Sequence, residues 1–151
     1  MAYLKYFFKI LKHKYYVFIA GLALDVPLYR LLKHDMSKFS IYEFKQYTRY
    51  FSKKDNLNEF RIAWQHHKNH NDHHWQYWID TDDREIEYID MPEVCIKEMV
   101  ADWLAAGKAY KGKWPDLNNW TWFNENYPKI KISDLTRSRL LNIIGHLGRE
   151  W

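Results

Sequence analysis

The sequence holds a single cysteine, Cys95, in 151 residues. One thiol cannot form an intramolecular disulfide, so the chain is compatible with a reducing compartment. A thiolate metal site also needs more cysteine than this, and any metal ion must therefore bind to histidine and carboxylate side chains. Because Cys95 lies in an apolar helical stretch, we expect it in the core and not in a nucleophilic site.

Long apolar runs and glycine-rich loops are missing as well. The uncharged stretch at residues 15–24 is shorter than the roughly 20 residues that a transmembrane helix needs, and no clear A-x-A cleavage site accompanies it. We therefore expect no stable membrane insertion, with a peripheral membrane helix as the alternative for this segment. No Gly-x-Ser-x-Gly motif or glycine-rich phosphate loop occurs, which leaves nucleophilic acyl transfer with little support.

Hydrophobic residues, by contrast, are abundant. They make up 47% of the chain, with 19% aromatic, which is enough apolar surface for one core and argues against disorder. No internal repeat and no linker rich in glycine, serine and proline divides the chain, so we predict a single domain over residues 1–151. The net charge of +4 gives a modest preference for anionic partners, but it does not choose among nucleic acid, nucleotides and membranes.

Helical periodicity and capping signals follow one another along the chain. They predict helices over about residues 3–20, 27–35, 40–51, from 56 onward, 92–107, 116–126 and 133–147. Residues 79–89 are the least helical and are predicted as a loop with, at most, a short hairpin. Ser40 and Glu43 match a capping box, in which each side chain satisfies an exposed amide at the start of a helix. The pattern predicts an all-α bundle of about six or seven helices.

Five of the eight histidines lie between residues 66 and 74. Neutral imidazole is the commonest protein ligand for transition metals. On a helix, histidines three or four residues apart can face one cation, as His66 or His67 could with His70. The alternatives are a solvated polar helix end or core histidines bonded to their neighbours. The density of the cluster favours metal or phosphate chemistry.

His34 and Asp35 form a second element, at the end of an apolar helix where adjacent side chains can diverge around one ion. An aspartate oxygen and a histidine nitrogen together suit Mn, Fe, Co, Ni or Zn better than Ca. His13 and Asp102 add a third and a fourth element. Taken singly, each is more typical of an ordinary helix residue than of a ligand.

The order of these elements resembles the HD superfamily of metal-dependent phosphohydrolases. His34-Asp35-Met36-Ser37-Lys38 is similar to its H-D-x-G-K segment, with serine in place of the usual glycine, and Val100-Ala101-Asp102-Trp103 is similar to its final A-D segment. More narrowly, residues 10–108 resemble an uncharacterised family of small histidine-rich phage and bacterial proteins.

The resemblance implies a compact HD-like helical bundle with one or two divalent ions drawn from Mn, Fe, Co, Ni and Zn. The first ion would be held by His13, His34, Asp35 and Asp102. Asp35 could bridge to a second ion held by His67 and one of the neighbouring histidines, for which we select His73. The histidines around Asn71 are denser than a one-metal site needs, so the number of ions stays open.

Roles for the remaining residues follow from the same resemblance. Asp35 and Lys38 are expected to be catalytic, with Lys38 neutralising the phosphate or protonating the leaving oxygen. For Glu98 we favour a simple surface glutamate over a residue that orients a ligand histidine. The expected substrate contacts are Lys14, Lys38, His66, His70, His74, Trp75 and Lys108.

The expected activity is hydrolysis of a nucleotide or cyclic nucleotide by metal-activated water. DNA is not expected as a partner, since no helix carries a dense basic stripe and no helix-turn-helix signature occurs. A homo-oligomer is left open, and the expected location is cytoplasmic, in the host if the chain is phage-encoded. The alternatives are a nucleotide-binding sponge without catalysis and an HD-like diiron oxygenase.

Overall fold

A computed structural model of the chain describes residues 1–53, 57–81 and 85–150. Within these ranges the fold is all-α, as predicted, with one small hairpin. The predicted start of the fourth helix at Asn56 lies outside the described residues. The helices are α1 (Ala2–Ala23), α2 (Leu28–Lys33), α3 (Ile41–Lys53), α4 (Leu57–His70), α5 (Glu93–Lys111), α6 (Thr121–Asn126) and α7 (Asp134–Glu150), and the strands are β1 (Ile79–Thr81) and β2 (Ile86–Tyr88).

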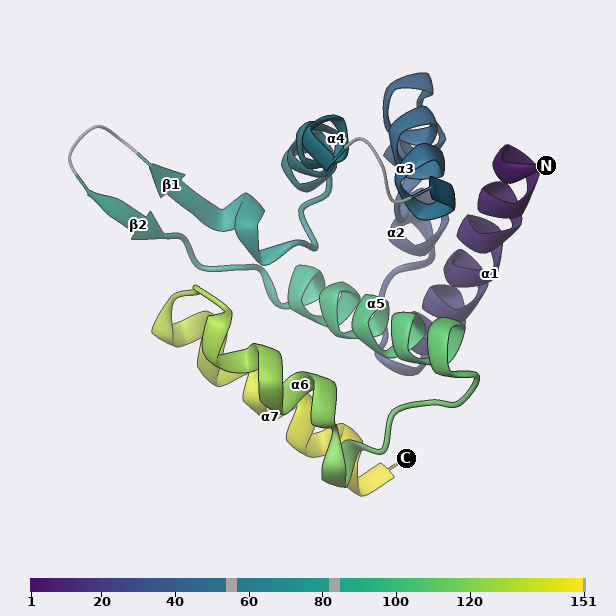
Figure 1. Cartoon of the computed structure of the whole chain (residues 1–151). Helices are drawn as coiled ribbons and strands as arrows, with labels where there is room; N and C mark the ends of the chain where they lie inside the picture. The colour runs from purple at the N-terminus through teal and green to yellow at the C-terminus, as the bar shows by residue number, and fades with distance from the viewer. Residues whose placement is uncertain (54–56, 82–84, 151) are drawn as a thin grey trace.

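Helix α5 runs through the middle of the molecule (Figure 1). Helix α1 crosses it with the most extensive contact in the fold, α3 and α4 lie on one side, and α6 and α7 lie on the other. The central position follows from its sequence, because apolar residues recur every three or four positions on more than one face. Its buried apolar residues are Cys95, Ile96, Met99, Val100, Ala101, Leu104 and Ala105. Among the described helices, none is both long enough and apolar enough to cross a bilayer.

Two hydrophobic clusters flank the centre of the bundle. The larger joins α1, α5 and α7 and includes Val17, Met99 and Leu140, which are at most 1% exposed. The smaller joins α1, α3 and α4 through Tyr6, Tyr47 and their neighbours. Burying each large apolar side chain contributes about 1.5–3 kcal/mol, so both clusters hold α1 firmly against its neighbours. The polar residues described below lie between them.

The predicted hairpin is present and projects from the bundle (Figure 1). Strands β1 and β2 pair antiparallel, with Ile79 opposite Tyr88 and Thr81 opposite Ile86. The turn between them lies outside the described residues. Both strands are largely exposed, so the hairpin adds little to the core.

The predicted capping box is only half correct. The Ser40 hydroxyl accepts a hydrogen bond from the Glu43 backbone N–H at 3.2 Å, as a helix cap should. The Glu43 carboxylate, however, does not return to the Ser40 amide, which instead donates to the carbonyl of Ser37 at 2.9 Å. Glu43 is completely buried and turns inward, toward two histidines of α4.

The contact between α1 and α2 predicts a measurable packing cost. A Cβ atom at Gly21 in α1 would collide with the Leu31 side chain of α2, whereas a Cβ at Gly145 in α7 would meet no atom within 4 Å. Both glycines are helical, so alanine brings a similar gain in helix propensity at each. We expect Gly21→Ala to be less stable than Gly145→Ala by about 1–3 kcal/mol, measured by urea unfolding. Equal stabilities would contradict the close approach of α1 and α2.

Candidate metal centre

Five separate segments bring histidine and carboxylate side chains to one buried place between the two clusters. Helix α1 supplies His13, and the turn after α2 supplies His34 and Asp35. Helix α4 supplies His67, and α5 supplies Asp102. The turn between α4 and the short 3₁₀ segment Trp75–Trp78 adds His73 and His74. The convergence on which the sequence prediction depended is therefore present.

The first group contains the four residues expected to hold the first ion. His13 Nε2 lies 2.8 Å from Asp102 Oδ1 and 3.7 Å from Asp35 Oδ2. His34 Nε2 lies 3.4 Å from Asp35 Oδ2 and 3.8 Å from Asp102 Oδ1. One ligand atom from each residue falls within 4.8 Å of all the others, so these side chains could hold one metal ion together.

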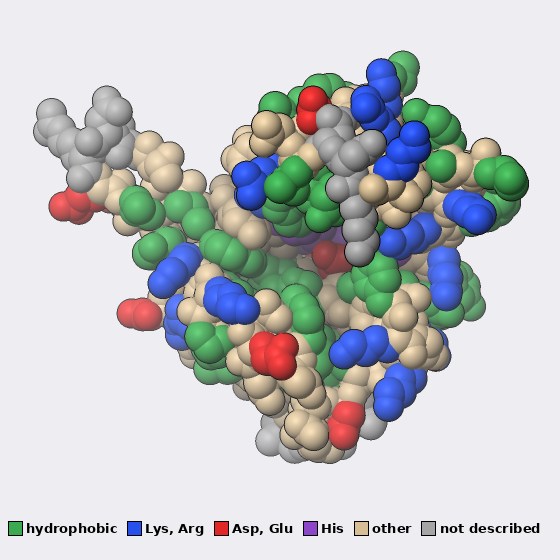
Figure 2. Space-filling model, viewed as in Figure 1, with side chains coloured by type: hydrophobic (Ala, Val, Ile, Leu, Met, Phe, Trp, Pro, Cys, Tyr) green, Lys and Arg blue, Asp and Glu red, His purple; other side chains and the backbone are tan. Residues whose placement is uncertain are grey.

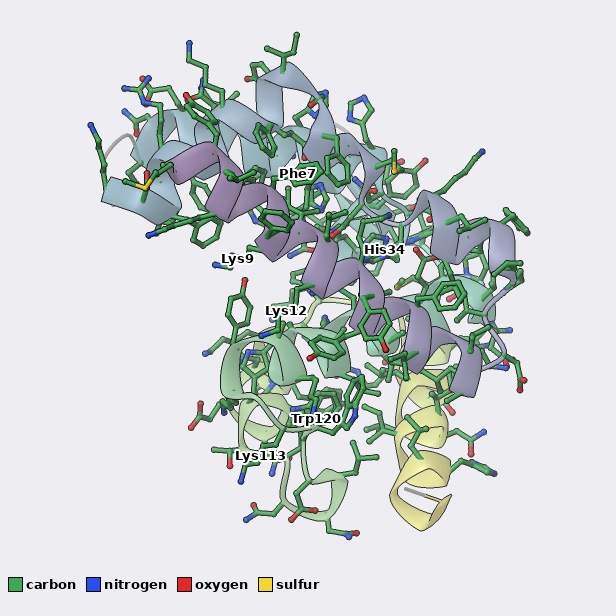
Figure 3. The ribbon with its side chains drawn as sticks, turned by 90° about the vertical axis from the view of Figure 1, so that its right-hand side faces the viewer. Phe7, Lys9, Lys12, His34, Lys113 and Trp120 are labelled. Atoms are coloured by element: carbon green, nitrogen blue, oxygen red, sulfur yellow. The ribbon has the colours of Figure 1, made fainter. Side chains whose placement is uncertain are left out.

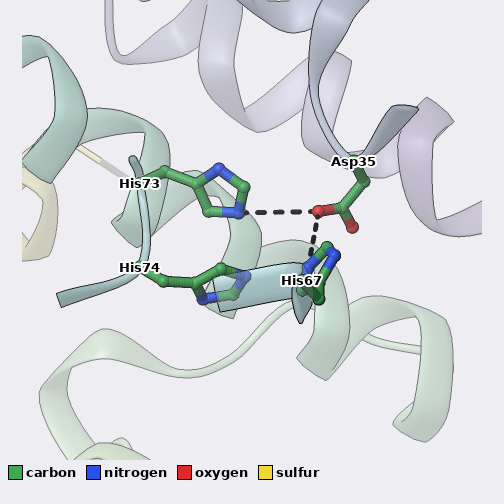
Figure 4. A group of neighbouring side chains, drawn as sticks. All are labelled: Asp35, His67, His73 and His74. Atoms are coloured by element: carbon green, nitrogen blue, oxygen red, sulfur yellow. Dashed lines mark ion pairs between the residues drawn. The ribbon is translucent and has the colours of Figure 1, made fainter. Parts of the chain in front are cut away.

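The second group uses the other oxygen of Asp35. His67 Nε2 lies 3.2 Å and His73 Nε2 lies 3.6 Å from Asp35 Oδ1, and His74 completes the group (Figure 4). The two oxygens of one carboxylate therefore face two different sets of ligands. This is the arrangement expected of a carboxylate that bridges two ions.

A strained backbone conformation places Asp35 there. Its φ of 57° lies in the left-handed region, which costs a residue other than glycine about 1–2 kcal/mol. The turn ends α2 and starts the 3₁₀ segment Met36–Phe39, so His34 and Asp35 diverge although they are adjacent. The carboxylate is fully buried as a result.

Ligand atoms at the centre lack hydrogen-bond partners. Among the described side chains, the Nε2 atoms of all five histidines and Asp35 Oδ1 are buried without a hydrogen bond. Buried polar atoms are nearly always bonded, because an unsatisfied one costs about 1–3 kcal/mol. Cations bound in the two groups would satisfy these six converging atoms together. Nitrogen and oxygen donors without a thiolate suit the metals predicted from the sequence.

Glu98 orients two of the histidines. It accepts from His34 Nδ1 at 2.9 Å, lies 3.4 Å from His73 Nδ1, and is itself held by Arg30 Nε at 2.6 Å. A carboxylate can only accept here, so the Nδ1 of His34 carries the proton and its Nε2 is left free to bind a metal. The sequence prediction of a surface glutamate was wrong: Glu98 is 3% exposed. The spacing of four residues from Asp102 was the available signal.

Glu43 and Ser37 do the same for His67, and the sequence analysis missed both. His67 Nδ1 lies 3.0 Å from Glu43 Oε2 and 2.9 Å from Ser37 Oγ. The Asn71 amide donates to Ser37 Oγ at 2.9 Å and ties the end of α4 to this network. The serine that replaces the usual glycine of the resembled motif therefore has a role, because its hydroxyl bonds a ligand histidine.

The electrostatics keep the acidic ligands charged. Burial alone would raise the pKa of Asp35, but His34, Lys38 and His67 hold it well below its usual range. Burial acts in the same direction on Asp102, and the close approach of the His13 and His34 rings likewise holds its pKa well below the usual value. Ionised carboxylates are the form that binds a cation.

The histidines divide into two kinds. Burial lowers the pKa of His74 to about 3 and, with the charge of His34, holds that of His73 well below its usual value. Burial also disfavours the charged form of His34 and His67, but Asp35 outweighs it and raises the pKa of both. A cation that binds here would displace protons from His34 and His67, while His73 and His74 are already neutral.

A cavity of about 290 Å³ opens onto one side of this centre. Figure 2 shows it as a hollow between the two halves of the molecule, with histidine and acidic atoms at its floor. His13, His74 and Asp102 line it on the metal side, together with the cations Lys9 and Lys38. The rest of the lining is mainly apolar and aromatic, made by Tyr6, Ile10, Tyr47, Phe51, Phe60, Trp64, Ala106 and Tyr110.

Of the predicted substrate contacts, Lys38 and His74 reach the cavity. Lys38 is half-buried and forms an ion pair with Asp35. Burial lowers the pKa of Lys38, but Asp35 and Asp102 outweigh it and raise the pKa above its ordinary value. His74 lies among the candidate ligands instead of serving substrate alone.

The other five predicted contacts lie away from the described lining. Lys14 donates to the backbone carbonyls of Leu32 and His34, and Lys108 donates to that of Gly112. Two of the histidines and one tryptophan are also engaged elsewhere: His66 bonds Glu43, exposed His70 stacks on His66, and Trp75 packs against the larger core. Their roles in substrate binding stay predictions. Trp64 lines the cavity and was not selected from the sequence.

Fold and site together define a small all-α protein with a buried histidine and carboxylate cluster that could hold metal. The chain belongs to a family of unknown function, DUF5662, which matches residues 2–146. This membership assigns no activity, and the resemblance to the HD superfamily stays a prediction. Searches of curated proteins and of solved structures found no match.

The shared carboxylate predicts how many ions are lost on mutation. We expect the wild-type protein to retain two transition-metal ions per chain after dialysis, measured by mass spectrometry of the metals. Asp35→Ala should lose both ions, whereas His13→Ala and His74→Ala should each lose one, because each contributes to only one group. Exposed His146 in α7 provides the control, since His146→Ala should keep both. Two ions retained by Asp35→Ala would contradict a bridging role.

The supporting role of Glu98 predicts that its substitution weakens metal binding without removing a candidate ligand. Supporting carboxylates behind ligand histidines typically contribute about 10- to 100-fold in metal affinity. We expect Glu98→Gln to weaken Zn binding by that factor, measured by competition with a chromophoric chelator. Glu93, on the same helix, has a side chain that is 59% exposed and pairs with Lys97, so Glu93→Gln is the matched control. Equal affinities for the two variants would show that Glu98 does not support the centre.

Proposed function

We propose that this protein is a metal-dependent phosphohydrolase or phosphodiesterase that acts on a nucleotide or a cyclic nucleotide. The single observation that carries the proposal is the division of the Asp35 carboxylate between two groups of ligands, beside a cavity with two lysines. Paired metal sites with a mixed nitrogen and oxygen donor set are typical of enzymes that hydrolyse phosphate esters. The resemblance of the sequence to the HD superfamily supports the same class.

Metal ions bound here would polarise the phosphoryl group and lower the pKa of a coordinated water. In the reaction, a water oxygen bonds to phosphorus, the ester P–O bond breaks, the leaving oxygen takes up a proton, and phosphate is released. A phosphodiester or cyclic ester is opened in the same way to a monoester. The residues of this chain position the participants: Glu43 and Glu98 fix the histidines behind the centre, which leaves the cavity side open for substrate.

Lys38 is the proposed phosphate contact. Its ammonium group pairs with Asp35 at the cavity wall, and its raised pKa keeps it charged at neutral pH. This charge suits neutralisation of the transferring phosphate better than proton donation. Lys9 also lines the cavity, where its ammonium group lies 4.0 Å from the centre of the Phe51 ring and 4.8 Å from that of Tyr110 and adds positive charge.

The test is a screen for released product with Mn, Co, Ni, Zn, Fe and Mg. Nucleoside mono- and triphosphates and cyclic nucleotides are incubated with the protein, and phosphate or ring-opened product is measured. His34→Ala and Asp35→Ala should lose turnover by several orders of magnitude while keeping most of their helicity in circular dichroism. Turnover that persists in both variants would reject the assignment.

Lys38→Met separates catalysis from metal binding. Because Lys38 is not a candidate metal ligand, this variant should keep its metal content and lose turnover. Nucleotide recovered unaltered, with binding that survives chelation, would instead indicate a nucleotide sponge. The donor set also suits iron; oxygen-dependent product and a diiron absorption band would indicate an oxygenase in place of a hydrolase.

A further inference from the structure

A second and larger cavity lies next to the one at the metal centre. It has a volume of about 470 Å³ and lies between the C-terminal half of α5 and the segment 113–122. We call it the tryptophan pocket, because Trp103, Trp114, Trp120 and Trp122 all line it. Its other lining residues are Ala106, Gly107, Tyr110, Lys111, Lys113, Pro115, Asp116, Asn119 and Thr121.

The pocket is built by specific backbone features. Gly112, with φ of 75°, ends α5 and reverses the chain, and Lys108 fixes this turn by donating to the Gly112 carbonyl at 3.1 Å. The returning segment then lies so close to α5 that a Cβ at Gly107 would be 2.7 Å from Pro115 Cγ. The wall that faces α5 is therefore held in place by packing, turn geometry and a hydrogen bond.

The aromatic walls suit a planar ring. Trp103 and Trp122 pack against each other with ring centroids 5.4 Å apart, and Trp122 also lies 6.0 Å from Trp120. Trp122 is 38% exposed, although most large aromatic side chains of this region are buried or half-buried. Exposed Lys111 and Lys113 add positive charge at the rim, and Asn119 and Thr121 add hydrogen-bonding groups. In Figure 3, Lys113 and Trp120 lie below Lys9 along the same side of the molecule.

The two cavities share Ala106 and Tyr110. On α5, the candidate ligand Asp102 lines the cavity at the metal centre and its neighbour Trp103 lines the tryptophan pocket. Ala106 follows one turn later, about 6 Å along the helix axis at 1.5 Å per residue. The side chain of Ala106 is a single methyl group. A ligand that occupied both cavities would pass Ala106 and Tyr110, the two residues that the linings share.

We propose that the tryptophan pocket binds the base of a nucleotide whose phosphate lies at the metal centre. The two shared residues and the combination of adjacent, mutually tilted tryptophan rings with lysines carry this inference, which rests on the proposed function for the position of the phosphate. A base stacked on a tryptophan gains about 5- to 150-fold in affinity, and the gain does not depend on the metal. The pocket therefore selects nucleotides over sugar phosphates that lack a base.

The test compares ligands that share a phosphate and differ in the base. AMP, GMP, CMP, UMP and ribose 5-phosphate are titrated calorimetrically into the protein, with and without a chelator. At least one nucleotide should bind 5-fold or more tightly than ribose 5-phosphate in both conditions, and Trp122→Ala should remove this difference. Tyr88→Ala on the hairpin is the control, because Tyr88 is 40% exposed and lies far from the pocket in sequence.

The outcomes separate this inference from the proposed hydrolysis. A preference for a nucleotide that depends on Trp122 supports the base site, even if no substrate is turned over. If no nucleotide binds more tightly than ribose 5-phosphate, or if Trp122→Ala keeps the preference, the base site is rejected, even when phosphate is released. In an active protein, Trp122→Ala should raise KM for the nucleotide and leave kcat within about 2-fold, since the metal ligands are intact.

Discussion

The candidate metal centre is organised around the carboxylate of Asp35, whose two oxygens contact two different sets of histidines. One oxygen faces His13 and His34 and the other faces His67 and His73, so four elements of the fold meet at a single side chain. A buried charge of this kind is strongly unfavourable unless opposite charge surrounds it. Lys38 supplies part of that charge, and a bound cation would supply the rest. Metal binding at this site would therefore be coupled to the packing of α1, α4 and α5.

The glutamates behind the histidines explain how so many ionisable groups can be packed between two hydrophobic clusters. Glu98 faces the ring nitrogens of His34 and His73, and Glu43 faces those of His66 and His67. Arg30 then pairs with both Glu98 and Asp72, which carries the chain of alternating charges to the surface. Each buried ion thus has a partner of opposite sign, and the ring nitrogens that point inward are the ones without a bond.

The helices could be predicted because apolar periodicity and capping signals are local properties of the sequence. The first four candidate ligands could be selected because His34 and Asp35 are adjacent and because the order of the elements resembles a known motif. The histidines after His67 could not be sorted in this way. The helical spacing rule ends with α4 at His70, and a turn, not a helix, decides that His73 and His74 point inward.

Rules that describe exposed sites also gave expectations that the buried surroundings do not follow. Glu43 matched a capping box, but three hydrogen-bonding groups inside the protein, on Ser37, His66 and His67, bind its carboxylate in place of the Ser40 amide. Lys14 and Lys108 looked available for phosphate, yet each satisfies a backbone carbonyl at the end of a helix or turn. The histidines that bind Glu43 and the carbonyl that binds Lys14 are distant from them in sequence, and a single sequence does not reveal such contacts.

Cys95, which lies beside the residues that support the candidate metal centre, is protected from oxidation by its burial. Its thiol is 2% exposed and lies 3.4 Å from Asp72, the same carboxylate that holds Arg30. Burial and the charge of Asp72 raise the pKa of the thiol to about 12. Because the thiolate is the reactive form, oxidants and alkylating reagents act on this cysteine only after the surrounding helices separate. The rate at which the sole thiol of the chain is alkylated therefore reports on unfolding of the helices that surround Asp72 and Arg30.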